Sequence, residues 1–132
     1  MYPAEVRAPN EFDGVFSTLA KRRVEAVIVD TDTLFVANGK AIAVIATKGR
    51  LPSVGSAEFA EAGGMMGYGP NLLELFRRAA YFVDRILKGA KPGDLPIERA
   101  TRFELVINMK TAKTLGITIP KVILVRADRV IE

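Results

Sequence analysis

The sequence predicts an α/β fold built on a parallel sheet, and three observations lead to this prediction. Residues 24–30 form a continuous apolar run that ends in an acid, which is typical of a strand buried on both faces of a parallel sheet. Residues 12–20 before this run and residues 35–48 after it carry apolar side chains at helical spacing. Residues 51–55 then predict another short strand. With a first strand near Val6, the order β-α-β-α-β predicts parallel strands joined by right-handed crossovers.

Local signals place the ends of these elements. Asn10 is a good N-cap residue for the first helix, because its side chain can accept a hydrogen bond from a backbone N–H of the first turn. Pro52 has no N–H group, which restricts its strand to a start position or to a sheet edge. Residues 56–62 predict a short helical turn.

Residues 63–71 are the most unusual segment, with the sequence Gly-Gly-Met-Met-Gly-Tyr-Gly-Pro-Asn. Four glycines and a proline in nine residues predict a poor core strand and exclude a helix. Such backbone suits a close approach to another domain or to a ligand. We therefore expect a hinge, or the rim of a ligand cleft, at this place.

The clearest amphipathic helix of the chain follows this glycine segment. Asn71 is expected to cap it, with Glu74 at the capping-box position, and Gly89 is expected to end it. Residues 90–99 are rich in proline and glycine and predict a crossing segment. The apolar stripe of the helix consists of Leu72, Phe76, Ala79, Ala80, Val83 and Leu87.

The last third of the chain predicts a strand, a short helix and a weaker element. Residues 102–108 alternate between apolar and polar side chains, as in a half-buried strand. Asn108 is expected to cap a helix that runs to Leu115 and ends at Gly116. Residues 122–131 predict a short strand or helix.

Composition excludes several classes of function. The chain has 132 residues, 49% of them hydrophobic and 26% charged, which predicts one folded domain with a real core. It has no Cys and no His, so disulfides, thiol nucleophiles, imidazole bases and the usual zinc ligands are all excluded. The net charge is +4, but the densest basic cluster, Lys21-Arg22-Arg23, falls at a helix C-terminus, where positive charge is favourable. We expect no nucleic-acid binding.

The strongest candidate for chemistry is Asp30-Thr31-Asp32-Thr33, which directly follows the predicted buried strand. Ligands of parallel α/β sheets bind at the carboxyl ends of strands. One interpretation is a solute site, in which a carboxylate and hydroxyl groups hold an amine or hydroxyl group. A second resembles the haloacid-dehalogenase phosphatases, with Asp30 as nucleophile, Asp32 as acid and base, and magnesium between them. A third is structural, with Asp32 or Thr33 capping the next helix.

Four other residues are candidates for the same region. Ser56 and Glu58 follow the next strand, and sheet geometry predicts that they lie beside the first site, although a capped helical turn explains them equally well. Tyr68 could stack on a ligand or pack with its hydroxyl group satisfied. Asn71 is primarily a cap, and the N-terminus of its helix could also bind an anion.

From about residue 24 onward, the chain resembles the C-terminal half of a family of ABC-transporter substrate-binding proteins. These are the periplasmic solute receptors that include tryptophan- and tyrosine-binding members. The matching residues occur in order over most of the chain, which is more specific than any single short motif. They are residues 61–71, 77–80, 86–96, 103–108, 112–116 and 126–132.

The resemblance implies a flavodoxin-like parallel sheet with flanking helices, as part of the second lobe of a type I periplasmic binding protein. Residues 1–132 would form one α/β domain, with residues 63–71 near the hinge, the Asn71 helix on the first lobe, and residues 90–102 crossing back. Asp32 falls where related receptors place an acid near the amino group of the ligand. The ligand-binding residues expected from the resemblance are Thr31, Asp32, Ser56, Glu58, Tyr68 and Asn71.

The chain also departs from the family that it resembles. Family members are more than twice as long, and they commonly have Ser where this chain has Gly67, which removes a hydroxyl group from the cleft rim. A half receptor leaves apolar faces uncovered. We therefore expect a homodimer, formed by exchange of the Asn71 helix with a second copy.

These observations predict a non-catalytic component of an ABC importer that needs no cofactor or metal. It would bind a small solute such as an amino acid and present it to a membrane permease. The alternatives are the phosphatase that uses Asp30-Thr31-Asp32, and an interaction fragment without a ligand. The resemblance implies a periplasmic protein. As written, residues 1–5 do not open a signal peptide and no stretch reaches transmembrane length, so the chain itself is expected in the cytoplasm.

Overall fold

The computed structural model describes all 132 residues, which divide into two compact units. The first unit contains residues 1–69 and 104–132, and the second contains residues 70–103. No helix is long and apolar enough to cross a membrane.

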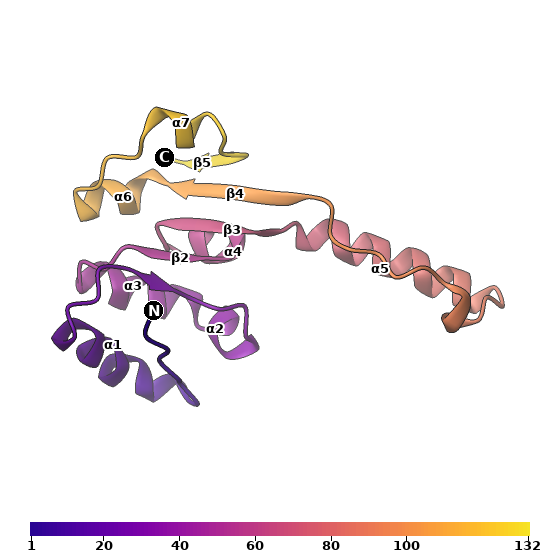
Figure 1. Cartoon of the computed structure of the whole chain (residues 1–132), viewed down its shortest axis with the longest axis horizontal. Helices are drawn as coiled ribbons and strands as arrows, with labels where there is room; N and C mark the ends of the chain where they lie inside the picture. The colour runs from indigo at the N-terminus through magenta and orange to yellow at the C-terminus, as the bar shows by residue number, and fades with distance from the viewer. The chain divides into compact units, whose positions relative to one another are not determined.

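A five-stranded sheet organises the first unit, and its strands lie side by side in the order in which they occur in the chain (Figure 1). The pairs β1–β2, β2–β3 and β4–β5 are all parallel, which confirms the predicted sheet type. The strands are β1 (Val27–Ile28), β2 (Ser53–Gly55), β3 (Met66–Pro70), β4 (Phe103–Asn108) and β5 (Arg129–Ile131).

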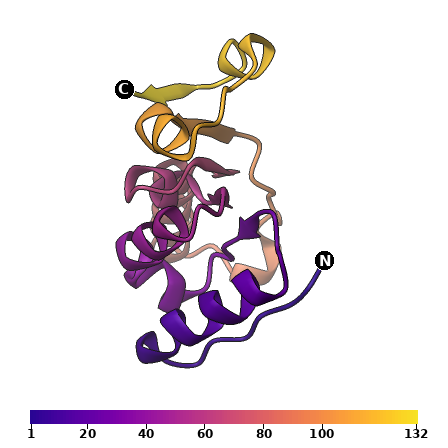
Figure 2. The same cartoon turned by 90° about the vertical axis from the view of Figure 1, so that its left-hand side faces the viewer.

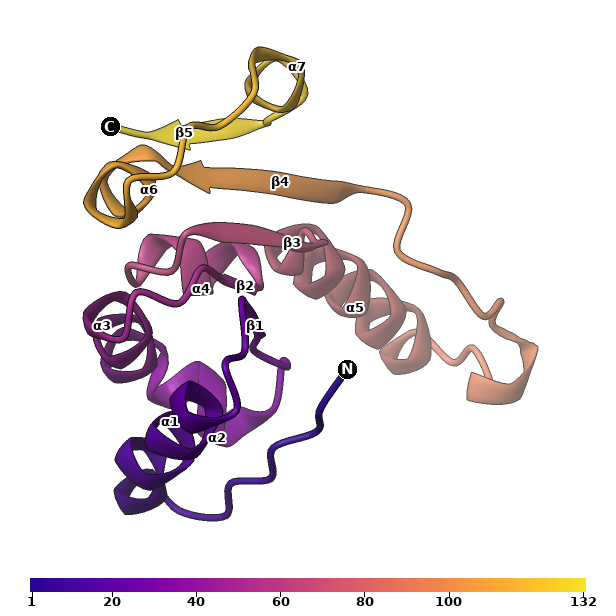
Figure 3. The same cartoon turned by 60° about the vertical axis from the view of Figure 1, so that its left-hand side comes forward.

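Short helices connect these strands, as expected for an α/β fold. In the first unit, α1 packs against α3 (Figure 2), and α6 and α7 lie on the connection between β4 and β5 (Figure 3). The helices of this unit are α1 (Phe12–Lys21), α2 (Thr33–Ala37), α3 (Gly39–Lys48), α4 (Ala57–Glu61), α6 (Met109–Leu115) and α7 (Lys121–Leu124). The second unit contains α5 (Leu72–Leu87), and one-turn 3-10 helices occur at Pro9–Glu11 and Pro92–Asp94.

The core of the first unit consists of small apolar clusters between the helices and the sheet. At one end, helices α1 and α3 bury Phe12, Leu19, Ile42, Ala43, Ala46 and Leu51. At the other end, β4 turns Val106 toward Ala57 and Ala60 of α4. Ile107 packs instead with Ala112 and Ile119. The second half of β4, Val106–Asn108, is therefore buried on both sides.

Predicted N-caps at five helices can be compared with the structure, and four are confirmed, one of them Asp32 at α2. The N–H groups of Phe59, Glu74 and Thr111 donate to the side chains of Ser56, Asn71 and Asn108, which therefore cap α4, α5 and α6. Gly116 ends α6 with φ at +72°, as expected for a C-cap glycine. Each of these signals depends on residues only a few positions apart, which is why sequence alone locates them.

The prediction for Asn10 was wrong. Asn10 lies inside a 3-10 turn that precedes α1, and no side chain caps that helix. Nor is there a strand at Val6, where the chain has no regular secondary structure. The predicted helix over residues 35–48 is two helices, because Asn38 leaves helical geometry (φ −112°, ψ 15°) and its side-chain amide donates to the Leu34 carbonyl group at 2.8 Å.

The apolar run of residues 24–30 forms a much shorter strand than predicted. Only Val27 and Ile28 are in β1, which lies at the edge of the sheet. Val27 is buried, whereas Ile28 is 74% exposed, so the strand is not buried on both faces. An apolar sequence shows that a strand could be covered on both sides, but not that the covering elements lie within the same chain.

The glycine segment is a strand, which corrects the prediction of poor strand backbone. Residues 66–70 form β3, which lies between β2 and β4. A Cβ atom on Gly67 would lie 2.3 Å from the Ser56 carbonyl oxygen, and one on Gly64 would lie 2.2 Å from the Phe59 ring. Gly67 therefore allows the turn between β2 and α4 to pack against the sheet, and Gly64 allows the Phe59 ring to do so. The same contact leaves no space for a side chain at position 67.

Candidate functional site

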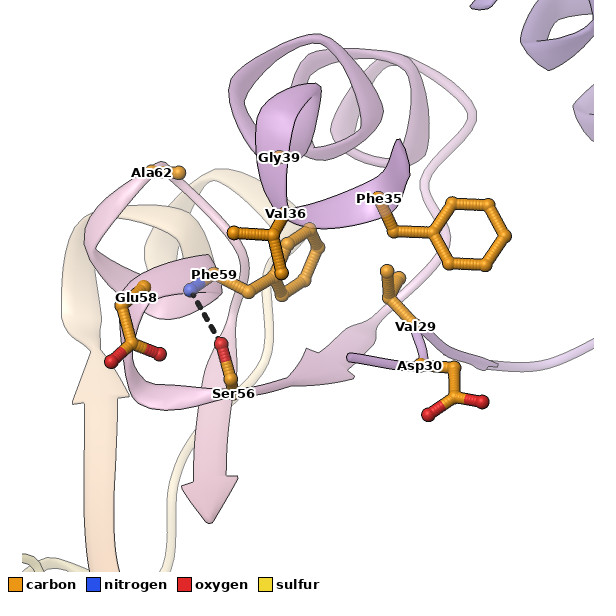
Figure 4. Close-up of a pocket in the computed structure, with 9 residues that line it drawn as sticks. All are labelled: Val29, Asp30, Phe35, Val36, Gly39, Ser56, Glu58, Phe59 and Ala62. Carbon is orange, nitrogen blue, oxygen red and sulfur yellow. Dashed lines mark hydrogen bonds between the residues drawn. The ribbon is translucent and has the colours of Figure 1, made fainter. Parts of the chain in front are cut away.

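A small hollow lies at the carboxyl ends of β1 and β2 in the first unit (Figure 4). Its volume is about 30 Å³, which is close to the space for one water molecule or one ammonium or methyl group. The hollow can therefore hold at least one end of a ligand. It is lined by Val29, Asp30, Phe35, Val36, Gly39, Ser56, Glu58, Phe59 and Ala62.

Phe59 forms the apolar inner wall of this hollow. Phe59 is buried, with only 6% of the residue exposed, and its ring lies against Gly55 and Gly64. Gly39 is also close, because a Cβ atom there would lie 3.8 Å from the ring. Two glycines, Gly55 of β2 and Gly64 before β3, thus leave the space that the Phe59 ring fills.

Two carboxylates lie at the rim, and both residues are exposed. Asp30 follows β1, and its Oδ1 accepts the Thr31 N–H at 2.7 Å. Glu58 projects from the first turn of α4 (Figure 4). The two carboxylates lie on different sides of the hollow, and no basic side chain lines it. The rim therefore favours a group that is positively charged or donates hydrogen bonds.

Ser56 lies between these carboxylates and has a structural role. Its Oγ accepts the Phe59 N–H at 3.4 Å, which caps α4 (Figure 4). A hydroxyl oxygen has two lone pairs and one proton, so this bond leaves the hydroxyl hydrogen available to a ligand. Ser56 and Glu58 are the two predicted site residues that the structure places in the hollow.

Thr31 and Asp32 lie next in the chain but do not line the hollow. Asp32 caps α2, because its Oδ1 accepts the Leu34 N–H at 2.8 Å. The prediction that Asp32 caps a helix is therefore confirmed. One bond to one oxygen does not use the whole carboxylate, and the residue is exposed, so its ligand role stays a prediction.

Tyr68 lies on the opposite face of the sheet from Phe59. In the parallel ladder, Gly55 pairs with Gly67, whose Cα faces the β2–α4 turn. Side chains alternate along a strand, so Tyr68 must point to the other face, on the same side as Val54 and Ile28. Tyr68 is 60% exposed there and does not line the hollow.

Asn71 belongs to the second unit, where it caps α5 by accepting the Glu74 N–H at 2.8 Å. Of the six predicted residues, only Ser56 and Glu58 therefore line the hollow. Thr31 and Asp32 lie outside it, Tyr68 lies on the other face of the sheet, and Asn71 lies in the second unit. Within the hollow, sequence reasoning missed the apolar wall of Phe35, Val36 and Phe59. In the sequence these three residues look like ordinary core residues. Only their positions in the first turns of α2 and α4, just after the capping residues, could have indicated a place near the site.

The acidic residues of the chain do not form a metal site. No group of three or more His, Cys, Asp or Glu side chains is close enough to hold a metal ion. What the hollow offers is an apolar wall, one hydroxyl group and two carboxylates.

The sequence matches the family described as ABC transporter substrate binding protein over residues 1–131. The tyrosine-binding protein of Clostridioides difficile (strain R20291) is 24% identical over 111 residues, which are 83% of this chain and 32% of that protein.

Two solved structures are similar over nearly the whole chain. A domain from Streptococcus pneumoniae, described as an ABC domain in complex with L-Trp, has a TM-score of 0.85 and 28% identity. A conserved domain protein from Vibrio cholerae O1 biovar El Tor has a TM-score of 0.88 and 26% identity. Each comparison covers 96% of this chain, but only 44% and 43% of the other chain. The chain therefore spans a third to less than half of the proteins that it matches.

Proposed function

Because this chain belongs to the ABC transporter substrate-binding protein family, we propose that it carries part of a solute site, at the carboxyl ends of β1 and β2. The observation that supports this most directly is the hollow between Asp30, Ser56 and Glu58. It occurs where parallel α/β sheets bind ligands, on a fold shared with a domain solved in complex with L-Trp.

We propose an amino acid as the ligand, and an aromatic one in particular. The hollow accepts a group the size of an ammonium group, and its rim supplies two carboxylates and no cation. The ammonium group of an amino acid fits this charge, while the Phe35, Val36 and Phe59 wall suits an adjacent apolar part. The carboxylate of the ligand would need donors from outside this hollow.

The transport role is a proposal for the longer proteins of this family. A receptor of this kind binds its solute outside the membrane and presents it to an ABC permease. The 111 matched residues span 32% of the tyrosine-binding protein, so this chain would supply one wall of the complete site. We propose binding without a catalytic step. Neither the family match nor the relatives described above support the phosphatase alternative.

Calorimetric titration with L-Trp, L-Tyr, L-Phe, L-Leu and L-Glu tests the proposal. We expect heat of binding with the aromatic amino acids and none with L-Glu, because its second carboxylate would meet Asp30 and Glu58. Asp30→Asn and Glu58→Gln should each weaken binding by about tenfold or more, as expected when a hydrogen bond between charged groups is lost. Asp94→Asn is the matched control, because Asp94 lies in the second unit and does not line the hollow.

The variants also decide between the predicted carboxylates. If Asp32→Asn abolishes binding while Asp30→Asn does not, the ligand contacts Asp32 and lies outside the hollow. If no amino acid binds to a folded sample, this chain alone does not form a working site and the proposal fails for residues 1–132.

A further inference from the structure

Helix α4 forms one side of the proposed solute hollow (Figure 4), but it is too short to hold its own position. Ser56, Glu58, Phe59 and Ala62 line the hollow from α4 and its two ends, and the other side comes from the end of β1 and from α2 and α3. Helix α4 has only five residues, and a helix of that length is not stable by itself. The places of Ser56 and Glu58 therefore depend on contacts between α4 and the rest of the first unit.

Asn108, the last residue of β4, makes a buried polar contact with α4. Its Nδ2 donates to the Ala60 carbonyl group at 3.0 Å, across 48 positions of the sequence. Its Oδ1 accepts the Thr111 N–H at 3.1 Å, and its own backbone N–H donates to the Met65 carbonyl group at 2.9 Å. Only 5% of Asn108 is exposed, so these bonds are shielded from water. The Asn108 side chain is thus held at both of its polar atoms.

The other contacts between α4 and the C-terminal strands are weaker or less directional. Arg129 of β5 pairs with Glu61, but these side chains are 50% and 46% exposed, and exposed ion pairs contribute little. Val106 packs on the apolar side of α4, and apolar packing holds a helix on a sheet without fixing where it lies along the sheet. A buried hydrogen bond is directional and costly to lose, so the bond from Asn108 to Ala60 is the contact that fixes α4.

We propose that Asn108 is a positioning residue for the solute hollow, an inference that rests on the function proposed above. By holding the Ala60 carbonyl group, Asn108 fixes α4 and with it the Ser56 hydroxyl group and the Glu58 carboxylate at the rim. Strands β4 and β5 and helix α6 contribute no residue to the hollow, so this part of the chain acts on the ligand through α4. All of these contacts lie inside the first unit.

Hydrogen exchange measured by NMR without any ligand tests whether Asn108 holds α4. Asn108→Ser keeps an oxygen that can cap α6, but the shorter side chain does not reach Ala60. The N–H groups of Ala60 and Ala62 donate to the carbonyl groups of Ser56 and Glu58 at 3.2 and 2.9 Å, so they report on α4. In Asn108→Ser we expect both amides to exchange about threefold faster or more, relative to the amides of α3.

Ile107→Val is the matched control for this variant. Ile107 directly precedes Asn108 in β4 and is also buried, but it packs with Ala112 and Ile119 and not with α4. Because side chains alternate along a strand, Ile107 and Asn108 point to opposite faces of the sheet. Ile107→Val should lower the free energy of unfolding without a selective effect on α4. If the α4 amides respond equally in the two variants, relative to α3, the proposal is overturned.

Calorimetric titration with L-Trp then tests the consequence for the site. Asn108→Ser should weaken binding about three- to tenfold, because the ligand must order a loosened α4, whereas Ile107→Val should bind as the wild type does. An Asn108→Ser chain with a loosened α4 and wild-type affinity would refute the positioning role. Absence of L-Trp binding to the wild type would instead refute the proposed function, and the exchange measurement would still decide whether Asn108 holds α4.

The wild-type chain offers a second measurement, which does not depend on whether a variant folds. If the bond from Asn108 to Ala60 favours ligand binding, then by thermodynamic linkage the ligand must favour that bond to the same extent. The side-chain amide protons of Asn108 should therefore exchange more slowly with solvent when L-Trp is bound. Unchanged exchange of these protons at saturating L-Trp would contradict the proposal.

Discussion

At the scale of single residues, the helix caps act through side-chain hydrogen bonds, whereas Gly67 acts through the absence of a side chain. Ser56, Asn71 and Asn108 each accept a backbone N–H three positions later. Asn108 also donates from its side-chain amide to the Ala60 carbonyl group at 3.0 Å, so it ties α4 to β4. Gly67 acts by having no side chain where the backbone of the β2–α4 turn passes.

Gly67→Ala should therefore destabilise the protein. The added methyl group meets backbone atoms of Ser56 and Ala57, which cannot move aside as a flexible side chain would. We expect a loss of about 1–3 kcal/mol in the free energy of unfolding, as for other overpacked sites. Chemical denaturation measures this loss. Gly69→Ala is the matched control, because it lies in the same strand and no atom comes within 4 Å of its Cβ position.

At the scale of elements, an exposed ion pair joins the two parts of the second unit. The segment that follows α5 returns along it and brings Glu98 to Arg78, twenty positions away. The hydrogen bond from Arg78 lowers the pKa of the Glu98 carboxyl group, and the same bond raises the pKa of Arg78. Arg78 stays cationic at ordinary pH, so only Glu98 makes the pairing depend on pH.

The pairing of Glu98 with α5 should be lost in acid. Because the pKa of Glu98 is lower in the folded than in the unfolded chain, its contribution is complete above the unfolded value of about 4.3. It disappears as the pH falls through the lower, folded value. Carboxyl chemical shifts followed by NMR should show this depressed pKa. In Arg78→Gln the shift should vanish, and an unchanged Glu98 titration in that variant would contradict the assignment.

At the scale of the whole molecule, the two units differ in how they are stabilised. The first unit has buried clusters on both sides of β4. The second has no buried residue in its only long helix. Local opening requires little energy where few apolar groups are buried, so the second unit should open more often than the first.

Hydrogen exchange should reveal this difference. The amides of α5 should exchange faster than those of α3 and β4, because no residue of α5 is buried. Equal protection of the two units would show that α5 is stabilised by contacts within the chain.

The sequence alone determined the features that depend on neighbours in the chain. It predicted a parallel α/β sheet and the caps at Ser56, Asn71 and Asn108, because periodicity and capping involve residues a few positions apart. It also placed Ser56 and Glu58 at a strand end beside the first candidate site. The strand at Val6 and the two-sided burial of residues 24–30 were wrong, because each required a contact that other parts of a fold must supply. The cap at Asn10 was wrong for a local reason, since Asn10 lies inside the 3-10 turn Pro9–Glu11.

Only the tertiary structure decided which side chains share one place. Pairing of Gly55 with Gly67 sets the pleat that turns Tyr68 to the face opposite Phe59, and a shift of one residue would reverse that choice. Packing against Gly55 and Gly64 places Phe59 behind Asp30, Ser56 and Glu58. The folded chain likewise leaves the apolar stripe of α5 exposed, although the stripe has the spacing of a core helix. Local interactions define where an element begins and ends, whereas strand register and burial are set by contacts between residues far apart in the chain.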